Sequence, residues 1–235
     1  DKANPAIWKN NLAPSYKHLE KVESSNHRAI EWEDLPKFIK TLNERSKPLG
    51  ARPDLDCMLF MILTVSRSQE ARLVDWNEID LQKKIWCQPK GKYKSKKLDW
   101  DIPLCQTTIK ILKAQPSYKR QQGRIFSTLD GGELYSAALS TIPDALGFDA
   151  VAHGFRSTFK SYCQEESVND EVSELSLKHA ETTSTRAAYA KNQLITPRTK
   201  LIKEYEIDTS YTHWAGDSNQ DHIATFRTTM ASARY

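Results

Sequence analysis

The chain has 235 residues, and its 34 Lys and Arg against 30 Asp and Glu give a formal net charge of +4. Hydrophobic residues make up 39% and charged residues 27%, which argues against a wholly disordered protein. The 8 Gly and 4 Cys exclude the collagen-like and disulfide-scaffold classes. The length fits one large domain with extensions, or two small ones.

We expect neither a membrane span nor a secretion signal in this sequence. Its longest apolar run, residues 57–65, is shorter than the roughly 20 residues of a membrane span, and the first residues lack a basic-then-apolar signal pattern. The chain does not begin with Met, so we expect a fragment or a processed chain. The four cysteines are widely spaced, which favours reduced, mostly buried thiols in a cytoplasmic protein.

The first half begins with residues 1–28, which show little periodicity and are expected to be an N-terminal segment or interdomain linker. Apolar residues at helical spacing then predict a helix over 33–46. A second helix over 53–65 is apolar on nearly every side, so we expect it to be central. A further short helix is expected over 70–74.

Between residues 75 and 104 the pattern changes to short strands. The last of them alternates apolar with polar residues, a period of two. We expect a three-stranded antiparallel sheet, with residues 90–97 forming the turn between the last two strands. The apolar residues that indicate these strands are Trp76, Ile79, Leu81, Ile85, Trp86, Leu98, Trp100, Ile102 and Leu104.

Helical patterns resume over 106–114 and over 134–146, where Pro143 is expected to cause a kink or a boundary. Further helices are expected over 153–165, after a cap at Asp170, over 185–192, and from Pro197 as first helical residue. Residues 208–235 form a polar C-terminal tail. The predicted fold class is α+β, a mainly helical domain over residues 29–207 with a small antiparallel sheet.

The strongest local charge feature is the run 83–97, in which seven of fifteen residues are Lys, interleaved with Trp86 and Tyr93 and free of acids. Such a run is usually a solvated hairpin tip. In a nucleic-acid-binding protein it would contact DNA phosphates. The candidate DNA-binding residues are Lys90, Lys92, Lys96 and Lys97.

The sequence lacks the motifs of several common kinds of binding site. The sequence has no phosphate-binding Gly-x-x-x-x-Gly-Lys-Ser/Thr, no dinucleotide glycine fingerprint and no His-Glu-x-x-His. The six histidines never pair at i, i+4, and no ligand spacing fits a metal site. We therefore expect neither a metal nor a nucleotide cofactor.

The C-terminal half carries the positive evidence. His153-Gly154-Phe155-Arg156 places His and Arg on one face at the start of a helix, where free amides favour an anion. It is followed by Leu177-Lys178-His179-Ala180 and by Arg186-Ala187-Ala188-Tyr189, and it is preceded by Arg67-Ser68-Gln69-Glu70 and the lysine run. This order of residues resembles the catalytic set of the tyrosine recombinases, the phage-integrase family. Within that family, the sequence is most similar in character to integrases of prophages and genomic islands.

The resemblance covers about residues 30–207 and implies the fold of the DNA breaking-rejoining enzymes. It implies that Arg67 and Arg156 clamp a DNA phosphate, as guanidinium groups do in bidentate fashion. It further implies that Tyr189 attacks the phosphorus, forms a 3′-phosphotyrosyl bond and releases a 5′-hydroxyl.

The remaining roles follow from the same resemblance. His153 would accept the proton of the phenol and His179 would hydrogen-bond the phosphate. A lysine would donate a proton to the leaving oxygen; Lys94 is our choice and Lys92 the second. Because the covalent link keeps the phosphodiester energy, neither nucleotide nor metal is required.

The implied function is cleavage and rejoining of duplex DNA attachment sites, to integrate or excise a mobile element. The resemblance implies a homotetramer on paired attachment sites, assisted by DNA-bending accessory proteins, whereas the isolated domain is expected to be a monomer. The implied location is the bacterial cytoplasm, at the nucleoid. Ser66 stands where many relatives have Gly, and the N-terminal DNA-binding domains usual in the family are not expected in this chain. A non-catalytic DNA-binding module and a nicking-closing topoisomerase remain as alternatives.

The candidate residues also have ordinary structural interpretations. Arg67 could form a surface ion pair with Glu70. His179 could be a cation at a helix C-terminus, and Tyr189 could be a packing residue on an Ala-rich helix.

Overall fold

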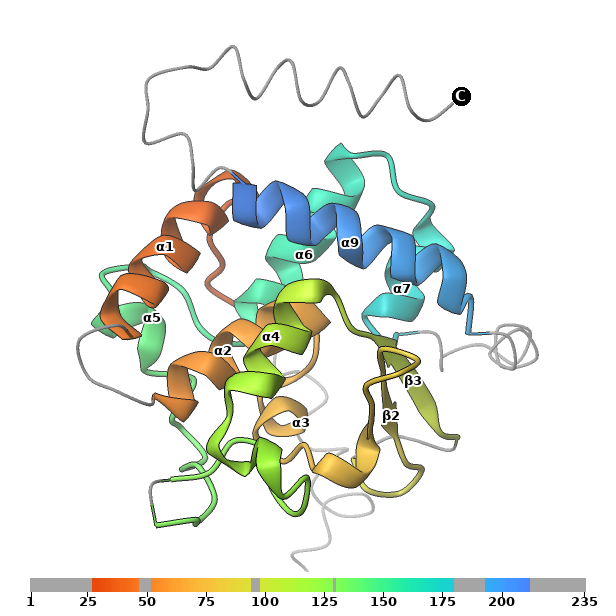
Figure 1. Ribbon diagram of the computed structural model, residues 1–235. Coiled ribbons are helices and arrows are strands. Elements are labelled where there is room, and N and C mark those ends of the chain that lie inside the picture. The colour runs from red at the N-terminus through yellow and green to blue at the C-terminus, as the bar shows by residue number, and fades with distance from the viewer. Residues whose placement is uncertain (1–26, 47–51, 94–97, 129, 180–192, 212–235) are drawn as a thin grey trace, which may run out of the picture.

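The computed structural model describes residues 27–46, 52–93, 98–128, 130–179 and 193–211 (Figure 1). Three strands and a set of helices make up this part of the chain. The elements are α1 (Leu35–Ser46), α2 (Pro53–Thr64), α3 (Ser68–Arg72), β1 (Ile79–Asp80), β2 (Ile85–Gln88), β3 (Trp100–Pro103), α4 (Gln106–Ala114), α5 (Ile142–Ala145), α6 (Gly154–Glu165), α7 (Asp170–Ser176) and α9 (Ile195–Tyr211), with 3₁₀ turns at Trp32–Asp34, Trp76–Glu78 and Pro116–Lys119.

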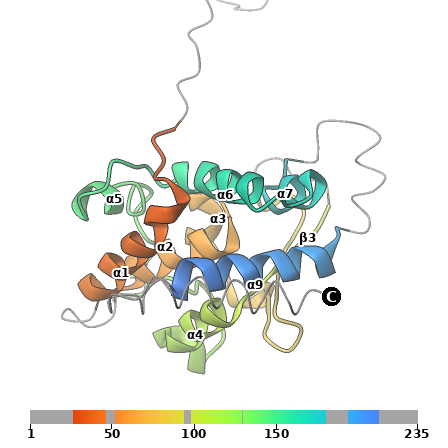
Figure 2. The same cartoon turned by 90° about the horizontal axis from the view of Figure 1, so that it is seen from above.

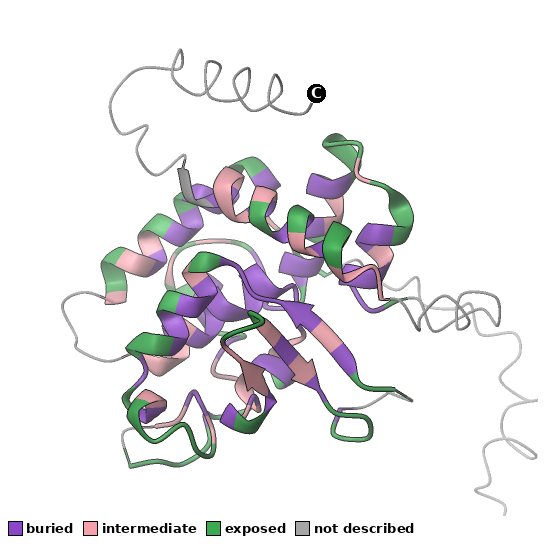
Figure 3. Ribbon diagram, turned by 45° about the vertical axis from the view of Figure 1, so that its right-hand side comes forward, coloured by how far each residue is buried: buried purple, intermediate pink, exposed green. Residues whose placement is uncertain are grey.

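Helix α2 is the centre of the fold. Its residues from Cys57 to Thr64 are all buried, and it contacts α1, α3, α4 and α9. The Phe60 ring lies 5.3 Å from the rings of both Trp86 and Phe126, measured between centroids. Figure 3 shows how the buried positions converge on this region while the outer helix faces stay exposed. The expectation of a central helix at 53–65 is confirmed.

The sheet has the order β1-β2-β3 and is antiparallel throughout. In β2, Trp86 and Gln88 are buried and alternate with less buried residues, the period of two expected for a strand that packs on one face. The mainly helical α+β class with a small three-stranded sheet is thereby confirmed. Trp76, expected in a strand, instead lies in a 3₁₀ turn, because its indole is buried and donates to Ser117 Oγ at 2.9 Å.

The helices lie on both sides of α2 and α3. Seen from above, α6 and α7 form one layer, and α9 and α4 lie on the opposite side (Figure 2). Helix α9 contacts α1, α2, α7 and β3, so it ties the first helix of the chain to the sheet. This arrangement brings the end of α2, the start of α6 and the end of α7 together, and the candidate site is built there.

The outer edge of β3 is held by Gln193, just before α9, and by Arg198, in the first turn of α9. The Gln193 amide donates to Asp99 O at 3.0 Å and accepts from the Asp101 backbone N–H at 2.7 Å. Arg198, 1% exposed, lies over the Trp100 ring at 5.2 Å and donates to Gln193 O at 3.2 Å. Side chains therefore fix the start of α9 against the strand.

Some expected boundaries differ from the structure. Of the helix expected over 134–146, only the short α5 forms. Pro143 lies in its first turn, where the missing amide costs nothing, so this proline marks the start of a helix. Helix α7 is capped by Asn169 and not by Asp170, since the Asn169 side chain accepts from the amides of Glu171 and Val172. Pro197 is the third residue of α9 and not the first.

The expected start of the polar tail at residue 208 falls inside α9. Thr209 is 1% exposed and its hydroxyl donates to Tyr205 O at 2.6 Å, so this part of the chain is packed. The expected segment 1–28, except its last two residues, the helix over 185–192 and the tail beyond 211 lie outside the described residues. All four cysteines are described and free, and three are buried. Among the described helices, none has the length and apolarity needed to cross a bilayer.

Candidate active site

Arg67 is placed by the way α2 ends. Val65 takes a left-handed conformation (φ 52°), and the Ser66 amide donates back to Met61 O at 3.2 Å. The hydroxyl groups of Thr64 and Ser66 lie 2.9 Å apart inside this turn. The helix thus ends at this turn, and Arg67 becomes the N-cap residue of α3, with its side chain about one third exposed.

Arg156 lies in the first turn of α6 and is 5% exposed. Its Nη1 donates to Val65 O at 2.6 Å, and its Nη2 donates to Leu177 O. These carbonyls stand at the C-terminal ends of α2 and α7, where helix dipoles favour a cation. One guanidinium group therefore joins the ends of two helices, and the described acceptors that hold it are neutral.

The start of α6 is held in place by a close backbone approach. A Cβ on Gly154 would lie 2.0 Å from Arg28 O, a distance that side chains do not tolerate. The same carbonyl accepts from the Val151 amide at 3.1 Å. Only glycine lets this segment pack here, and the packing fixes the His153 and Arg156 positions relative to α2.

The two arginines act on each other. Burial and the nearby charge of Arg67 lower the pKa of Arg156 to about 10, so Arg156 remains protonated at neutral pH. Two cations that interact in this way repel each other, and the nearby carboxylates of Glu70 and Glu174 offset part of that repulsion. The pair is therefore an electrostatically prepared site for an anion such as a phosphate.

His179 bridges Arg156 and an acid. Its Nδ1 lies 3.2 Å from Glu174 Oε2, and its Nε2 lies 3.2 Å from Arg156 Nη2. Because Arg156 can only donate, Nε2 accepts, which places the proton of the neutral ring on Nδ1. Burial, followed by the charge of Arg156, lowers the pKa of His179. The ring is thus neutral at pH 7 in this arrangement.

His153 stands at the start of α6, exposed, with its ring 4.4 Å from the ring of His27. Burial, His27 and then Arg156 and Arg67 lower its pKa. A neutral imidazole is the form that can accept a proton. The structure therefore brings together four of the residues singled out from the sequence, namely Arg67, His153, Arg156 and His179.

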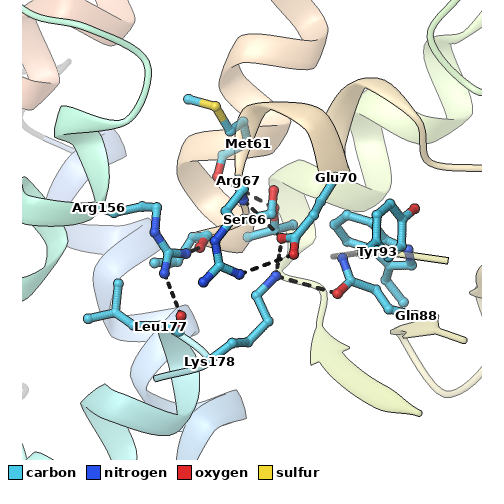
Figure 4. A network of polar contacts seen from close by, with 12 residues as sticks. Met61, Ser66, Arg67, Glu70, Gln88, Tyr93, Arg156, Leu177 and Lys178 are labelled. Carbon is cyan, nitrogen blue, oxygen red and sulfur yellow. Dashed lines mark hydrogen bonds and ion pairs between the residues drawn. The ribbon is translucent and has the colours of Figure 1, made fainter. Parts of the chain in front are cut away.

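A buried carboxylate connects Arg67 to a lysine that the sequence did not single out (Figure 4). Glu70, 3% exposed, accepts from the Arg67 amide at 3.0 Å and from Arg67 Nη1 at 3.3 Å. Lys178 Nζ donates to the same carboxylate and, at 3.4 Å, to Gln88 Oε1. The Arg67–Glu70 ion pair, named above as the ordinary alternative for Arg67, is present, but its acid is buried and belongs to a larger cluster at the site.

The lysine-rich turn expected over residues 90–97, called the lysine turn below, is anchored at its start by a second buried acid. Glu78, 4% exposed, accepts from Trp86 Nε1 at 2.9 Å, from the Tyr93 hydroxyl at 3.0 Å and from Lys92 Nζ. Lys90 is exposed, and its amide donates to Asp99 Oδ1 at 2.8 Å. The base of the turn is thereby fixed to the sheet.

Several predicted site residues lie outside the described part of the chain. These are the lysines Lys94, Lys96 and Lys97 and the tyrosine Tyr189. In the described residues, no group of three or more His, Cys, Asp or Glu is placed to hold a metal ion.

Sequence reasoning missed the roles of Glu174 and Lys178. Glu70 had a local signal, because an acid three residues after the N-cap of a helix commonly bonds back to the N-cap amide, as Glu70 does to Arg67. Lys178 had none, since its partner lies 108 residues away in sequence.

Two comparisons with known proteins found a similar protein each. The chain is 26% identical over 194 residues to the prophage integrase IntA of Escherichia coli (strain K12), a match that covers 80% of this chain and 45% of that protein. Its fold is similar to the integrase from mycobacterium phage Brujita, with a TM-score of 0.58 and 18% identity over 79% of this chain and 60% of that one. No model of a protein family matched the chain.

Proposed function

Because the chain is a member of the phage-integrase (tyrosine recombinase) family, we propose that it is the catalytic part of a site-specific integrase. It cleaves and rejoins duplex DNA through a 3′-phosphotyrosyl intermediate, to integrate or excise a mobile element. The matched segment spans less than half of the curated relative. The proposal therefore concerns the segment from residue 29 to the end of α9 as the catalytic domain, with 1–28 as a linker.

One observation carries this proposal, namely the paired arginines. Arg156 is held by two helix-end carbonyls, and Arg67 stands close enough to lower its pKa. Phosphoryl transfer depends on stabilising charge on the non-bridging oxygens, and preorganised guanidinium groups do this well. A phosphate between the two side chains would relieve their repulsion and gain hydrogen bonds from both.

In the proposed reaction the Tyr189 phenol oxygen attacks the phosphorus, and the P–O bond to the 5′ oxygen breaks. His153 takes the phenol proton, a role supported by its lowered pKa. The leaving 5′ oxygen receives a proton from Lys94, with Lys92 as the alternative. The reverse reaction, with a 5′-hydroxyl of another strand as attacking group, rejoins the DNA. No metal and no nucleotide takes part.

His179 is proposed to donate a hydrogen bond to the bound phosphate. In the present arrangement its Nε2 accepts from Arg156. Donation to a phosphate oxygen therefore requires the second ring proton, and a bound phosphate should raise the pKa of His179. This coupling makes the protonation of His179 a reporter of phosphate binding.

The lysine turn is proposed to contact the DNA backbone through Lys90, Lys92, Lys96 and Lys97. Such contacts release counterions, so binding should weaken steeply with salt. Four protomers are proposed to assemble on two attachment sites in the cytoplasm at the nucleoid, aided by DNA-bending proteins, while the isolated domain is a monomer.

A covalent-trapping experiment tests the proposed function. The probe is a nicked duplex that spans the junction between the encoding element and the flanking chromosome, because the nick lets the cleaved fragment diffuse away. We expect a protein-linked DNA band on a denaturing gel. Tyr189→Phe should abolish the band, and Tyr135→Phe, at a side chain 75% exposed, should not.

Other outcomes identify the alternatives. Binding of the duplex without any covalent band would favour a non-catalytic DNA-binding module. Rapid relaxation of supercoiled DNA by the monomer, without exchange of strands between sites, would favour a nicking-closing topoisomerase.

A further inference from the structure

Lys178 combines two unfavourable features. Its side chain is 4% exposed, so its ammonium group is almost fully removed from water. Its backbone takes φ 59°, the left-handed region that favours glycine. A buried ammonium group is stable only when it is paired and hydrogen-bonded. The pairing is supplied by Glu70 and Gln88, on α3 and β2, far from Lys178 in sequence.

The shared carboxylate has an electrostatic consequence for Arg67. An isolated Arg67–Glu70 pair would be neutral, and its guanidinium group would attract a phosphate only weakly. With Lys178 on the same carboxylate, two cations share one anion, and the cluster keeps a net charge of 2 − 1 = +1. Lys178 thereby leaves Arg67 with positive charge available to a substrate while Glu70 still fixes its position.

The position of Lys178 in the chain has a second consequence. The preceding residue, Leu177, supplies a carbonyl to Arg156, and the following residue, His179, contacts Arg156 Nη2. An anchored Lys178 therefore fixes two of the groups that orient Arg156. Figure 4 shows Lys178 reaching from the end of α7 to Glu70, beside both arginines.

We propose that Lys178 is a positioning residue for the phosphate site: its ion pair with Glu70 keeps Arg67 charged and holds the 177–179 segment against Arg156. This inference rests on the proposed function, because it concerns the same phosphate. Lys178 touches neither DNA nor the reacting atoms in this role, and it is distinct from the lysine proposed to protonate the leaving oxygen.

The main test compares single-turnover cleavage of the nicked duplex at saturating protein. Loss of one direct oxyanion donor commonly slows a reaction by about 10²–10³. Because Lys178 acts through other residues, we expect Lys178→Met to slow cleavage by about tenfold, with the DNA dissociation constant changed by less than about threefold. An unchanged cleavage rate would overturn the proposal.

Two further variants separate charge from structure. Lys178→Gly removes the ammonium group but relieves the left-handed backbone, so it should melt above Lys178→Met and still slow cleavage as much. A merely structural role predicts that the cleavage rate of the two variants follows their melting temperatures. Adding Glu70→Gln to Lys178→Met removes the carboxylate that would otherwise neutralise Arg67. We expect the double variant to recover part of the rate, whereas a purely structural role predicts a further loss.

A readout without cleavage keeps this inference separate from the proposed function. Inorganic phosphate should raise the melting temperature of the wild-type protein, and the rise should shrink in Lys178→Met because the site carries one positive charge fewer. If wild-type protein forms no covalent band and phosphate stabilisation still depends on Lys178, the proposed function fails and the role of Lys178 stands. Equal phosphate stabilisation of both proteins would refute that role.

Discussion

Two buried glutamates hold the two basic regions of this protein, and they do so differently. Glu78 binds partners that lie 8 to 15 residues further along the chain, all on the sheet or the lysine turn. Glu70 binds Arg67, three residues before it, and Lys178, 108 residues after it. Both carboxylates are almost fully buried, so neither could remain ionised without its cations.

The difference lies in what each acid connects. Glu78 stabilises one hairpin locally, and Lys92 keeps a side chain about one quarter exposed that can turn toward solvent. Glu70 connects α3 to the end of α7, and Lys178 is too buried to find water if the acid is lost. A long-range pair of this kind joins separate parts of the chain into one site, whereas the local pair shapes a surface.

The largest expected effect is that of Glu70→Gln. This change leaves the buried Lys178 without its counter-charge, and breaking a buried ion pair in this way costs about 3–5 kcal/mol of unfolding free energy. Urea unfolding of the two proteins measures the loss. The added change Lys178→Met should recover a large part of it, and failure to recover any would show that Glu70 acts through other contacts.

The matched change at the local site, Glu78→Gln, should cost less. The amide oxygen still accepts from Trp86 or Tyr93, and Lys92 can move into solvent, so we expect about 1–3 kcal/mol. The same urea experiment provides the comparison. Equal losses for the two glutamate variants would remove the distinction between a local and a long-range acid.

A smaller effect is expected for Tyr93→Phe. It deletes one hydroxyl bonded to Glu78 at 3.0 Å and leaves the ring in place against Trp86. A single hydrogen bond of this type contributes about 0.5–1.5 kcal/mol. Urea unfolding should give a value in this range, and salt-dependent DNA binding should stay unchanged because no lysine is removed.

The smallest effect is a dependence of stability on pH. The pKa values of His153 and His179 are lowered by burial and by the arginines, so the unfolded chain binds more protons than the folded one. Stability therefore rises with pH up to about 6.5, the ordinary value, and is lost as pH falls through the lower folded values. The double variant His153→Asn, His179→Asn should flatten this part of the melting-temperature profile.

Sequence patterns predict those elements that depend on local periodicity. The helix expected over 106–114 coincides with α4, and the central helix with α2 but for its last residue. The helix expected over 134–146 was wrong over most of its length. There, successive turns with bonds such as Ala138 N to Tyr135 O replace a helix until α5 begins at Ile142.

The site was predictable where short motifs carry it. His153 and Arg156 share one helix turn, and Arg67 and His179 lie in recognisable segments, so the four could be named as candidates without knowledge of the fold. Their orientation was not predictable, because the carbonyls that hold Arg156 lie 91 and 21 residues away. The roles of Lys94 and Tyr189 stay predictions.

The hold of Gln193 on β3 has a consequence for association between molecules. β3 is the outer strand of the described sheet, and outer strands offer free amides and carbonyls to the backbones of other chains. The Gln193 side chain occupies one such amide and one such carbonyl, those of Asp101 and Asp99. A foreign strand can pair with this stretch of β3 only by displacing the Gln193 side chain, which therefore hinders strand addition at this edge of the sheet.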